Sequence, residues 1–313
     1  MCIAVWTLSH PSYALVLAAN RDEHLDRPTV PAQFHNFGEH NEGSETEIGH
    51  ILSGVDTRAG GTWFGVNRSG DVGLLTNITE TPRKWTSSRG HLVSRFLLHS
   101  HAKDGSEDPL HDFIDVATSN EERYAGFNLV LFSPTKSDNP EDRISYKATL
   151  LTNHGGGGDI VSKSLDGLTA NSLPSQTLDK RGTINLGCVS NGAENLSEWP
   201  KVKKARQSLQ EILDEPHLSE EDLTERLFQL LQWEPPVKPE KPRDTILVAP
   251  IHIPRIGSNG LYATRLSSII LITHSGDVLF IERDIFIPGN AVDVSSVPKA
   301  PSSSQRVFRF RIQ

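Results

Sequence analysis

The sequence of 313 residues has few cysteines, little excess of basic charge and no long apolar run. Its two cysteines, Cys2 and Cys188, exclude a disulfide framework and indicate a reducing compartment. Its 31 basic against 39 acidic side chains give a net charge of −8, which argues against binding nucleic acid through broad attraction to phosphates. No run approaches the ~20 apolar residues that a membrane-spanning helix needs. We expect no nucleic-acid partner and no membrane span, and peripheral membrane association stays open.

The apolar stretch 1–19 has the composition of a secretory signal but not its organisation. It lacks a basic start, and the polar residues 9–12 divide it into two short pieces. We interpret it as a hairpin of two strands, 3–8 and 14–19, joined by a turn. We therefore expect a cytoplasmic protein.

The order of the remaining predicted elements indicates an α+β protein. Helices come in pairs between groups of hairpin strands, which argues against a parallel doubly wound sheet. We predict two mainly antiparallel sheets with helices outside them, in a single domain over residues 1–313. The predicted strands are 62–67, 72–78, 127–132, 144–152, 245–249, 268–273, 278–283 and a short C-terminal strand 307–312, and the predicted helices are 88–97, 108–117, 199–213 and 219–231.

Three segments are predicted to be irregular. Residues 24–59 form a loop-rich excursion, because glycine, histidine and glutamate are frequent there and the periodicity is weak. Gly155–Gly158 is a flexible connection that lacks the Lys-Ser/Thr ending of a phosphate-binding loop. Residues 234–242 contain four prolines and form a stiff linker.

Cys2 has the most distinct chemical signature in the chain. Removal of Met1 by methionine aminopeptidase would leave a cysteine with both a nucleophilic thiol and a free α-amine, which titrates near ~7.7 and can act as a base. Antiparallel pairing around a turn near residue 11 places Cys2 close to residue 20, next to Arg21 and Asp22. The alternative is that Cys2 is simply a small strand residue.

The two charged residues beside Cys2 also have two interpretations. Asp22 is a candidate to orient the amine or thiol, and Arg21 is a candidate to stabilise a thiolate or a substrate carboxylate. The alternative is a salt bridge at the open end of the hairpin. The residues alone do not choose between these interpretations.

The start of the chain resembles the NRDE family of transport and Golgi organisation 2 proteins. The resemblance begins with Met1-Cys2-Ile3 and Asn20-Arg21-Asp22-Glu23, and it continues in family order to about residue 285. It implies a cytoplasmic factor, associated with the Golgi or mitochondria, that supports Golgi organisation, protein secretion and the trafficking of haem or lipid such as acyl-CoA. The further matching segments are Gly60-Gly61-Thr62-Trp63-Phe64-Gly65-Val66-Asn67, Leu75-Thr76-Asn77, Ser88-Arg89-Gly90, Ser190-Asn191, Trp199-Pro200-Lys201-Val202 and Thr264-Arg265.

Members of this family resemble N-terminal nucleophile hydrolases of the penicillin V acylase and bile salt hydrolase type. That resemblance implies a four-layer αββα sandwich in which Cys2 attacks an amide. The roles it implies are orientation of Cys2 by Asp22, an oxyanion hole from Asn77 and Asn191, and support of the nucleophile by Arg265. The alternative function is therefore an active N-terminal cysteine amidohydrolase or thioesterase acting on a linear amide or an acyl thioester.

One position departs from the acylase pattern. The acylases carry an arginine just before the asparagine of the second strand, where this chain has Ala19. Arg21 lies two residues further on and points to the same side of a strand, so it is the candidate replacement.

The sequence predicts no metal site and no required cofactor. Its 13 histidines, including His99 and His101, show no zinc or haem-ligand spacing, so haem is expected only as cargo. Cys188, in the apolar stretch 186–189, is interpreted as a buried thiol. The aromatic residues of the strands and nearby loops are interpreted as core, with the lining of a ligand pocket as the alternative; these are Trp6, Trp63, Phe64 and Trp85.

Overall fold

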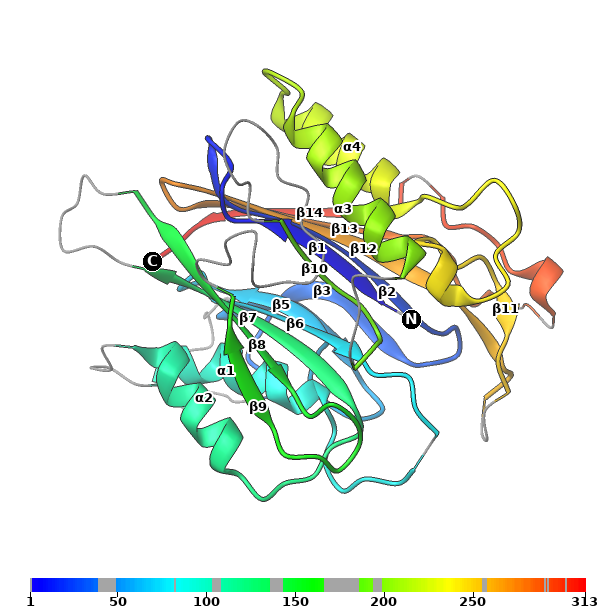
Figure 1. The fold of residues 1–313 in the computed structure, drawn as a ribbon, viewed down its shortest axis with the longest axis horizontal. Helices are drawn as coiled ribbons and strands as arrows, with labels where there is room; N and C mark the ends of the chain where they lie inside the picture. The colour runs from blue at the N-terminus through cyan, green and yellow to red at the C-terminus, as the bar shows by residue number, and fades with distance from the viewer. Residues whose placement is uncertain are drawn as a thin grey trace. The chain divides into compact units, whose positions relative to one another are not determined.

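Two seven-stranded sheets organise the part of the chain that the computed structural model describes (Figure 1). The described residues are 2–38, 49–81, 83–102, 108–135, 143–165, 186–193, 199–254, 258–289, 291, 293–301 and 303–313. The chain divides into two units, each around one sheet: Met1–Arg27 with Gly167–Arg309, and Pro28–Asp166 with Phe310–Gln313. That the two units act as one domain over 1–313 stays a prediction.

The sheet of the first unit has the strand order β10-β1-β2-β12-β13-β14, with β11 paired to β12. The pairs of β1 with β10 and β2, and of β12 with β2, β11 and β13, are all antiparallel. The elements of this unit are β1 (Ile3–Thr7), β2 (Tyr13–His24), β10 (Leu186–Val189), α3 (Pro200–Leu213), α4 (Glu220–Leu231), a short 3-10 helix (Pro242–Asp244), β11 (Ile251–His252), β12 (Leu261–Thr273), β13 (Asp277–Asp284), a second 3-10 helix (Val294–Ser296) and β14 (Gln305–Arg311).

Helices α3 and α4 lie side by side on one face of this sheet (Figure 1). Pro200 is tolerated in the first turn of α3, where its missing N–H has no helical partner, and Ser219 caps α4 by accepting a hydrogen bond from Asp222 N at 3.0 Å. Their apolar stripes meet the strands in one core. Representative members are Val202, Leu209, Leu227, Val16 and Ile269.

The sheet of the second unit is a meander in sequence order, β3 to β9, with each neighbouring pair antiparallel. Helices α1 and α2 pack on it through the helical residues Leu92, Phe96 and Phe113, which contact the strand residues Leu129 and Leu131 in one core. The elements are β3 (Thr29–His35), β4 (Ile51–Asp56), β5 (Phe64–Asn67), β6 (Val72–Asn77), α1 (Gly90–Ala102), α2 (Pro109–Ser119), β7 (Phe127–Thr135), β8 (Ser145–Thr152) and β9 (Val161–Ser164).

The α+β class with two mainly antiparallel sheets and four helices over the described residues is confirmed. The paired helices and most predicted strands are found with small changes of boundary. The predicted linker 234–242 contains no helix or strand before the 3-10 turn at its end, and the C-terminal strand 307–312 corresponds to β14.

The expectation of a loop-rich excursion over 24–59 is wrong for much of that segment. Strands β3 and β4 lie within it and pair with each other, while residues 39–48 lie outside the described ones. β3 escapes the period-two pattern because it is an edge strand in which Ala32 alone is buried and most other residues are half-buried. The segment also contains the boundary between the two units, at Arg27 and Pro28.

The strand predicted at 245–249 is also wrong. Thr245 to Val248 are buried, but they form no strand. The N–H groups of Ile246 and Leu247 both donate to the carbonyl of Trp233, at 3.2 and 3.0 Å. An apolar run alone does not show whether its backbone N–H and C=O groups pair with a neighbouring strand or bond within a loop.

The glycines at 155–158 have a packing role that the expectation of flexibility missed. A Cβ on Gly156 would lie 2.6 Å from the Trp85 ring, and one on Gly157 would lie 2.7 Å from it. Glu80 accepts hydrogen bonds from the N–H groups of Gly126 and Gly156 at 2.8 and 2.7 Å. The segment therefore needs residues without side chains because Trp85 packs against its backbone.

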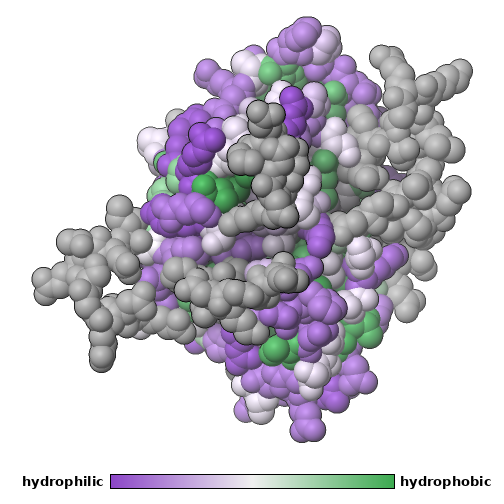
Figure 2. All heavy atoms as spheres, turned by 90° about the vertical axis from the view of Figure 1, so that its left-hand side faces the viewer, coloured by the Kyte–Doolittle hydropathy of each residue, from purple (hydrophilic) through white to green (hydrophobic). Residues whose placement is uncertain are grey.

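Hydrophilic residues dominate the face of the molecule in Figure 2, and the hydrophobic residues there lie in small separate groups. Among the helices of the described residues, none is both long and apolar enough to cross a membrane.

Candidate functional site

Cys2 lies where three strands of the first unit bring polar segments together. The β1–β2 register pairs Ile3 with Asn20, and the β1–β10 register pairs Ala4 with Val189. Continuing both registers past the end of β1 places Cys2 beside the polar end of β2 on one side and beside the residues that follow β10 on the other. The hairpin predicted from the sequence therefore delivers Cys2 to the NRDE segment.

The Cys2 thiol is held by the backbone of β2. Its Sγ donates to the carbonyl oxygen of Asp22 at 3.8 Å, and the Tyr262 hydroxyl donates to the same oxygen at 3.0 Å. Burial raises the pKa of Cys2, the nearby Asp22 charge raises it further, and Arg21 lowers it. The thiol is therefore protonated at neutral pH and needs a base before it can react as a thiolate.

The Cys2 carbonyl accepts two hydrogen bonds from distant parts of the chain. Ser190 Oγ donates at 2.7 Å and Lys201 Nζ donates at 3.3 Å. Lys201 is 0% exposed, and burial lowers its pKa while the charges of Asp22, Cys2 and Cys188 act in the opposite direction. These contacts place a lysine ammonium beside the candidate nucleophile.

The Asp22 carboxylate is fixed by β12. Thr264 Oγ1 donates to Asp22 Oδ1 at 2.6 Å and accepts a hydrogen bond from Val248 N at 2.9 Å. A register shift between Thr264 and Leu266 marks a bulge in β12 at this point. The β2–β12 register pairs Thr264 directly with Asp22, so the two side chains are cross-strand neighbours.

The other predicted site residues lie on several elements, and one of them belongs to the second unit. Arg21, on β2, is 5% exposed and lies near enough to lower the pKa of the Cys2 thiol. Asn191, which follows β10, is 3% exposed, and its side-chain oxygen lies 3.4 Å from Ser190 Oγ. Arg265 Nη1 donates to the carbonyl of Arg27. Asn77 ends β6 in the second unit. The catalytic roles of all these residues stay predictions.

Sequence reasoning missed Lys201, Ser190 and Thr264 as members of the site. Each lies inside a segment that resembles the family, but the resemblance implies no role for it. One signal pointed to Lys201: it occupies the apolar stripe of α3, four residues before Ala205, where a surface lysine does not belong. For Ser190 and Thr264 no comparable signal exists, because serine and threonine are ordinary residues at strand ends.

The other predicted features of the first unit have simple outcomes. Cys188 is half-buried and packs against the core, and desolvation raises its pKa to about 12. Met1 lies outside the described residues, so its removal stays a prediction. Among the described residues no group of three or more His, Cys, Asp or Glu is arranged to hold a metal ion.

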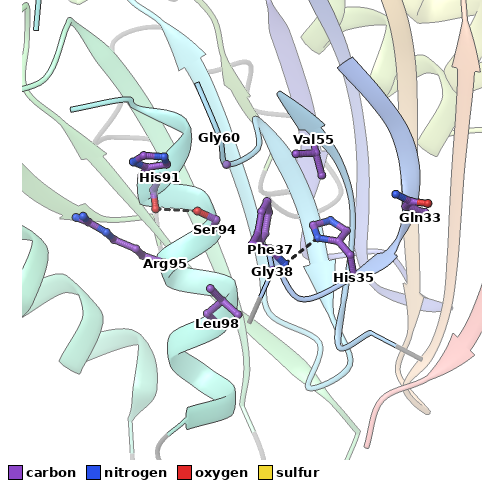
Figure 3. Close-up of a pocket in the computed structure, with 11 residues that line it drawn as sticks. Gln33, His35, Phe37, Gly38, Val55, Gly60, His91, Ser94, Arg95 and Leu98 are labelled. Atoms are coloured by element: carbon purple, nitrogen blue, oxygen red, sulfur yellow. Dashed lines mark hydrogen bonds between the residues drawn. The ribbon is translucent and has the colours of Figure 1, made fainter. Parts of the chain in front are cut away.

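The second unit contains a pocket of about 510 Å³ between β3, β4 and α1 (Figure 3). Its apolar lining includes Phe37, Val55 and Leu98, and its polar lining includes His35 and His91. The His35 ring is held in place, because Nδ1 accepts from Phe37 N at 3.2 Å and Nε2 contacts Ser53 Oγ at 2.9 Å. The volume lies in the range that small-molecule sites occupy.

Comparison with known proteins identifies relatives across the whole chain. A family model described as Transport and Golgi organisation 2 matches residues 1–286. A Transport and Golgi organization 2 homolog from Mus musculus is 28% identical over 290 residues, 89% of either chain. An uncharacterized protein of Saccharomyces cerevisiae is 26% identical over 344 residues and covers both chains completely.

Two solved structures were also matched at 10% identity. The Caenorhabditis elegans ortholog of N-acylethanolamine-hydrolyzing acid amidase gives a TM-score of 0.44, covering 86% of this chain and 92% of that one. A mutant of conjugated bile acid hydrolase from Clostridium perfringens gives a TM-score of 0.42, covering 100% of this chain and 97% of that one.

Proposed function

This chain belongs to the Transport and Golgi organisation 2 family, and we propose that it serves Golgi organisation and protein secretion by handling acyl compounds covalently through Cys2. The proposed substrates are linear amides and acyl thioesters such as acyl-CoA. The proposed location is the cytoplasm, in association with the Golgi or mitochondria. No resident cofactor or metal is part of the proposal.

The observation that carries this proposal is the environment of Cys2. A thiol at the end of a strand would ordinarily be a packing residue, yet this one lies near a carboxylate, a guanidinium and an ammonium, from Asp22, Arg21 and Lys201. Charged groups that are buried around a nucleophile cost free energy, and such arrangements concentrate at sites that need a shifted pKa.

The proposed reaction proceeds through an acyl-enzyme. Once Met1 is removed, the Cys2 α-amine takes the thiol proton and Sγ attacks the substrate carbonyl carbon. The side-chain amide of Asn191 donates to the oxyanion, an interaction worth about 3–4 kcal/mol in comparable sites. Collapse breaks the bond to the leaving amine or thiol, which takes the proton from the α-ammonium, and water then hydrolyses the S-acyl bond to release the acid.

A matched pair of cysteine variants tests the proposal. The protein is incubated with palmitoyl-CoA, free CoA is measured with a thiol reagent that does not denature the protein, and intact mass identifies an acyl adduct. We expect Cys2→Ala to lose both signals and Cys188→Ala to keep them. The hydrolase proposal is wrong if Cys2→Ala releases CoA as fast as the unaltered protein.

A second candidate function is non-covalent carriage of haem or acyl-CoA, and the pocket of the second unit favours it. The pocket combines apolar side chains from Phe37 and Leu98 with the imidazoles of His35 and His91 and the guanidinium of Arg95, a combination suited to amphipathic ligands (Figure 3). Titration with haem and with acyl-CoA should then give saturable binding that His91→Ala and Leu98→Asp weaken at least tenfold. Saturable binding that both variants leave unchanged would assign the ligand to another place.

A further inference from the structure

Lys201 is a lysine whose burial requires a reason. It stands in the first turn of α3 with 0% of its surface exposed. Lysine is almost never fully buried unless it is paired, because removing an ammonium from water is costly. Replacement by a leucine would fill the same apolar stripe without that cost.

The groups that surround Lys201 are the residues of the candidate site. Its Nζ donates to the Cys2 carbonyl at 3.3 Å and lies 5.8 Å from the centre of the Trp199 ring. Asp22 supplies the negative charge that favours the ammonium, and Cys2 and Cys188 raise the pKa of Lys201 in the same direction when they are ionised.

Two further cations belong to the same neighbourhood. Arg21 on β2 acts on the Cys2 thiol, and Arg206 on α3 acts on the Cys188 thiol. Lys201 is the cation that donates a hydrogen bond to Cys2 itself.

The second donor to the Cys2 carbonyl shows what Lys201 adds. Ser190 Oγ already donates to that oxygen at 2.7 Å, so a neutral partner satisfies its need for a hydrogen bond. A second donor at 3.3 Å is not required to hold the backbone. What Lys201 contributes beyond Ser190 is therefore a positive charge on the nucleophilic residue.

We propose that Lys201 is a positioning residue that holds Cys2 by its carbonyl and stabilises the thiolate of the same residue, with Asp22 as its counter-ion. Lys201 keeps its own proton throughout, and the thiol proton goes to the base. The same charge disfavours protonation of a freed Cys2 α-amine and so keeps that amine available as the base. This inference rests on the proposed function only for its consequence in turnover.

Alkylation of Cys2 measures the proposal without any substrate. Iodoacetamide reacts with thiolates, so its rate against pH, resolved by mass spectrometry of the Cys2 peptide, gives the midpoint of thiol ionisation. We expect Lys201→Met to raise the midpoint by about one pH unit, which slows alkylation about tenfold at pH values below both midpoints. Lys201→Arg keeps the charge and should restore most of the rate.

Ser190→Ala is the matched control, because it removes the other donor to the same carbonyl without a change of charge. We expect its midpoint to equal that of the unaltered protein. The proposal is overturned if Lys201→Met leaves the midpoint unchanged, or if Ser190→Ala shifts it equally, since Lys201 would then act only on structure.

A paired variant keeps the test decisive if Lys201→Met does not fold. Removing Asp22 as well, in Asp22→Asn with Lys201→Met, leaves no uncompensated carboxylate, and comparison with Asp22→Asn alone isolates the lysine charge. The same midpoint in both would refute the proposal. If Lys201 variants change the midpoint of Cys2 ionisation but the protein releases no CoA, this role of Lys201 is supported and the hydrolase proposal is refuted. If CoA release depends on Cys2 but Lys201 variants leave the midpoint unchanged, the hydrolase proposal is supported and this role of Lys201 is refuted.

Discussion

Asn20 is a stringent test of how the first unit holds its site together. The side chain is 3% exposed, and its Nδ2 donates to the carbonyls of Leu231 and Ile246 at 2.8 and 3.1 Å. Its Oδ1 accepts from Ser267 Oγ at 2.6 Å. One amide thus joins β2 to the end of α4, to the buried segment before β11 and to β12.

The substitution Asn20→Leu removes all three hydrogen bonds while keeping a similar volume. Two carbonyls and a hydroxyl then lose this buried partner, at about 1–1.5 kcal/mol each, so we expect a loss of about 3–4.5 kcal/mol in the free energy of unfolding. With a urea dependence of about 3 kcal/mol per molar, the midpoint falls by about 1–1.5 M.

Urea unfolding followed by tryptophan fluorescence and circular dichroism measures this loss. Ser267→Ala is the matched partial change, since it removes one of the three bonds and should cost about 1 kcal/mol. Asn20→Asp keeps the acceptor but presents a carboxylate to two carbonyl oxygens, so it should destabilise more as the pH rises and the acid ionises. A midpoint change below about 0.3 M for Asn20→Leu would refute the reasoning that this buried amide stabilises the unit.

Three other substitutions follow from single contacts. Gly187→Ala would place a Cβ 1.9 Å from the Trp6 indole, so it should cost at least about 1–3 kcal/mol in a urea titration. Burial lowers the pKa of His35 below 6.5, so the unfolded state binds more protons and stability should fall as the pH drops below about 6.5; because burial also lowers the pKa of His10, His35→Gln should reduce that slope without abolishing it in urea midpoints between pH 7.5 and 5.5. Arg306→Met would strip the buried Glu282 of an ion-pair partner at 3.0 Å, costing about 2–3 kcal/mol because Arg306 keeps 23% exposure.

The hairpin at the start of the chain could be predicted because its pairing is local. Once the turn near residue 11 is known, antiparallel geometry leaves little freedom, so the neighbourhood of Cys2, Arg21 and Asp22 follows from the residues themselves. The paired helices could be predicted for a similar reason, since caps such as Ser219 and the apolar spacing act within a few turns.

The wrong predictions concern segments whose local sequence pattern does not match their backbone hydrogen bonding. The segment 245–249 has the composition of a strand, but its N–H groups bond to Trp233 across a turn. The sequence of the edge strand β3 is not typical of a strand, yet β3 pairs with β4. In both cases the missing information was which distant backbone lies alongside.

By itself the sequence determined the fold class, the hairpin that delivers Cys2 to Asp22, and the family. Tertiary structure alone decided which side chains surround that cysteine: Lys201 reaches it from 199 residues away, Ser190 from 188, and Thr264 reaches Asp22 from 242. The physical reason is range. Periodicity and turn chemistry act over a few residues, whereas the burial of an ammonium beside a thiol depends on how separate strands and helices pack, and no spacing along the chain records that packing.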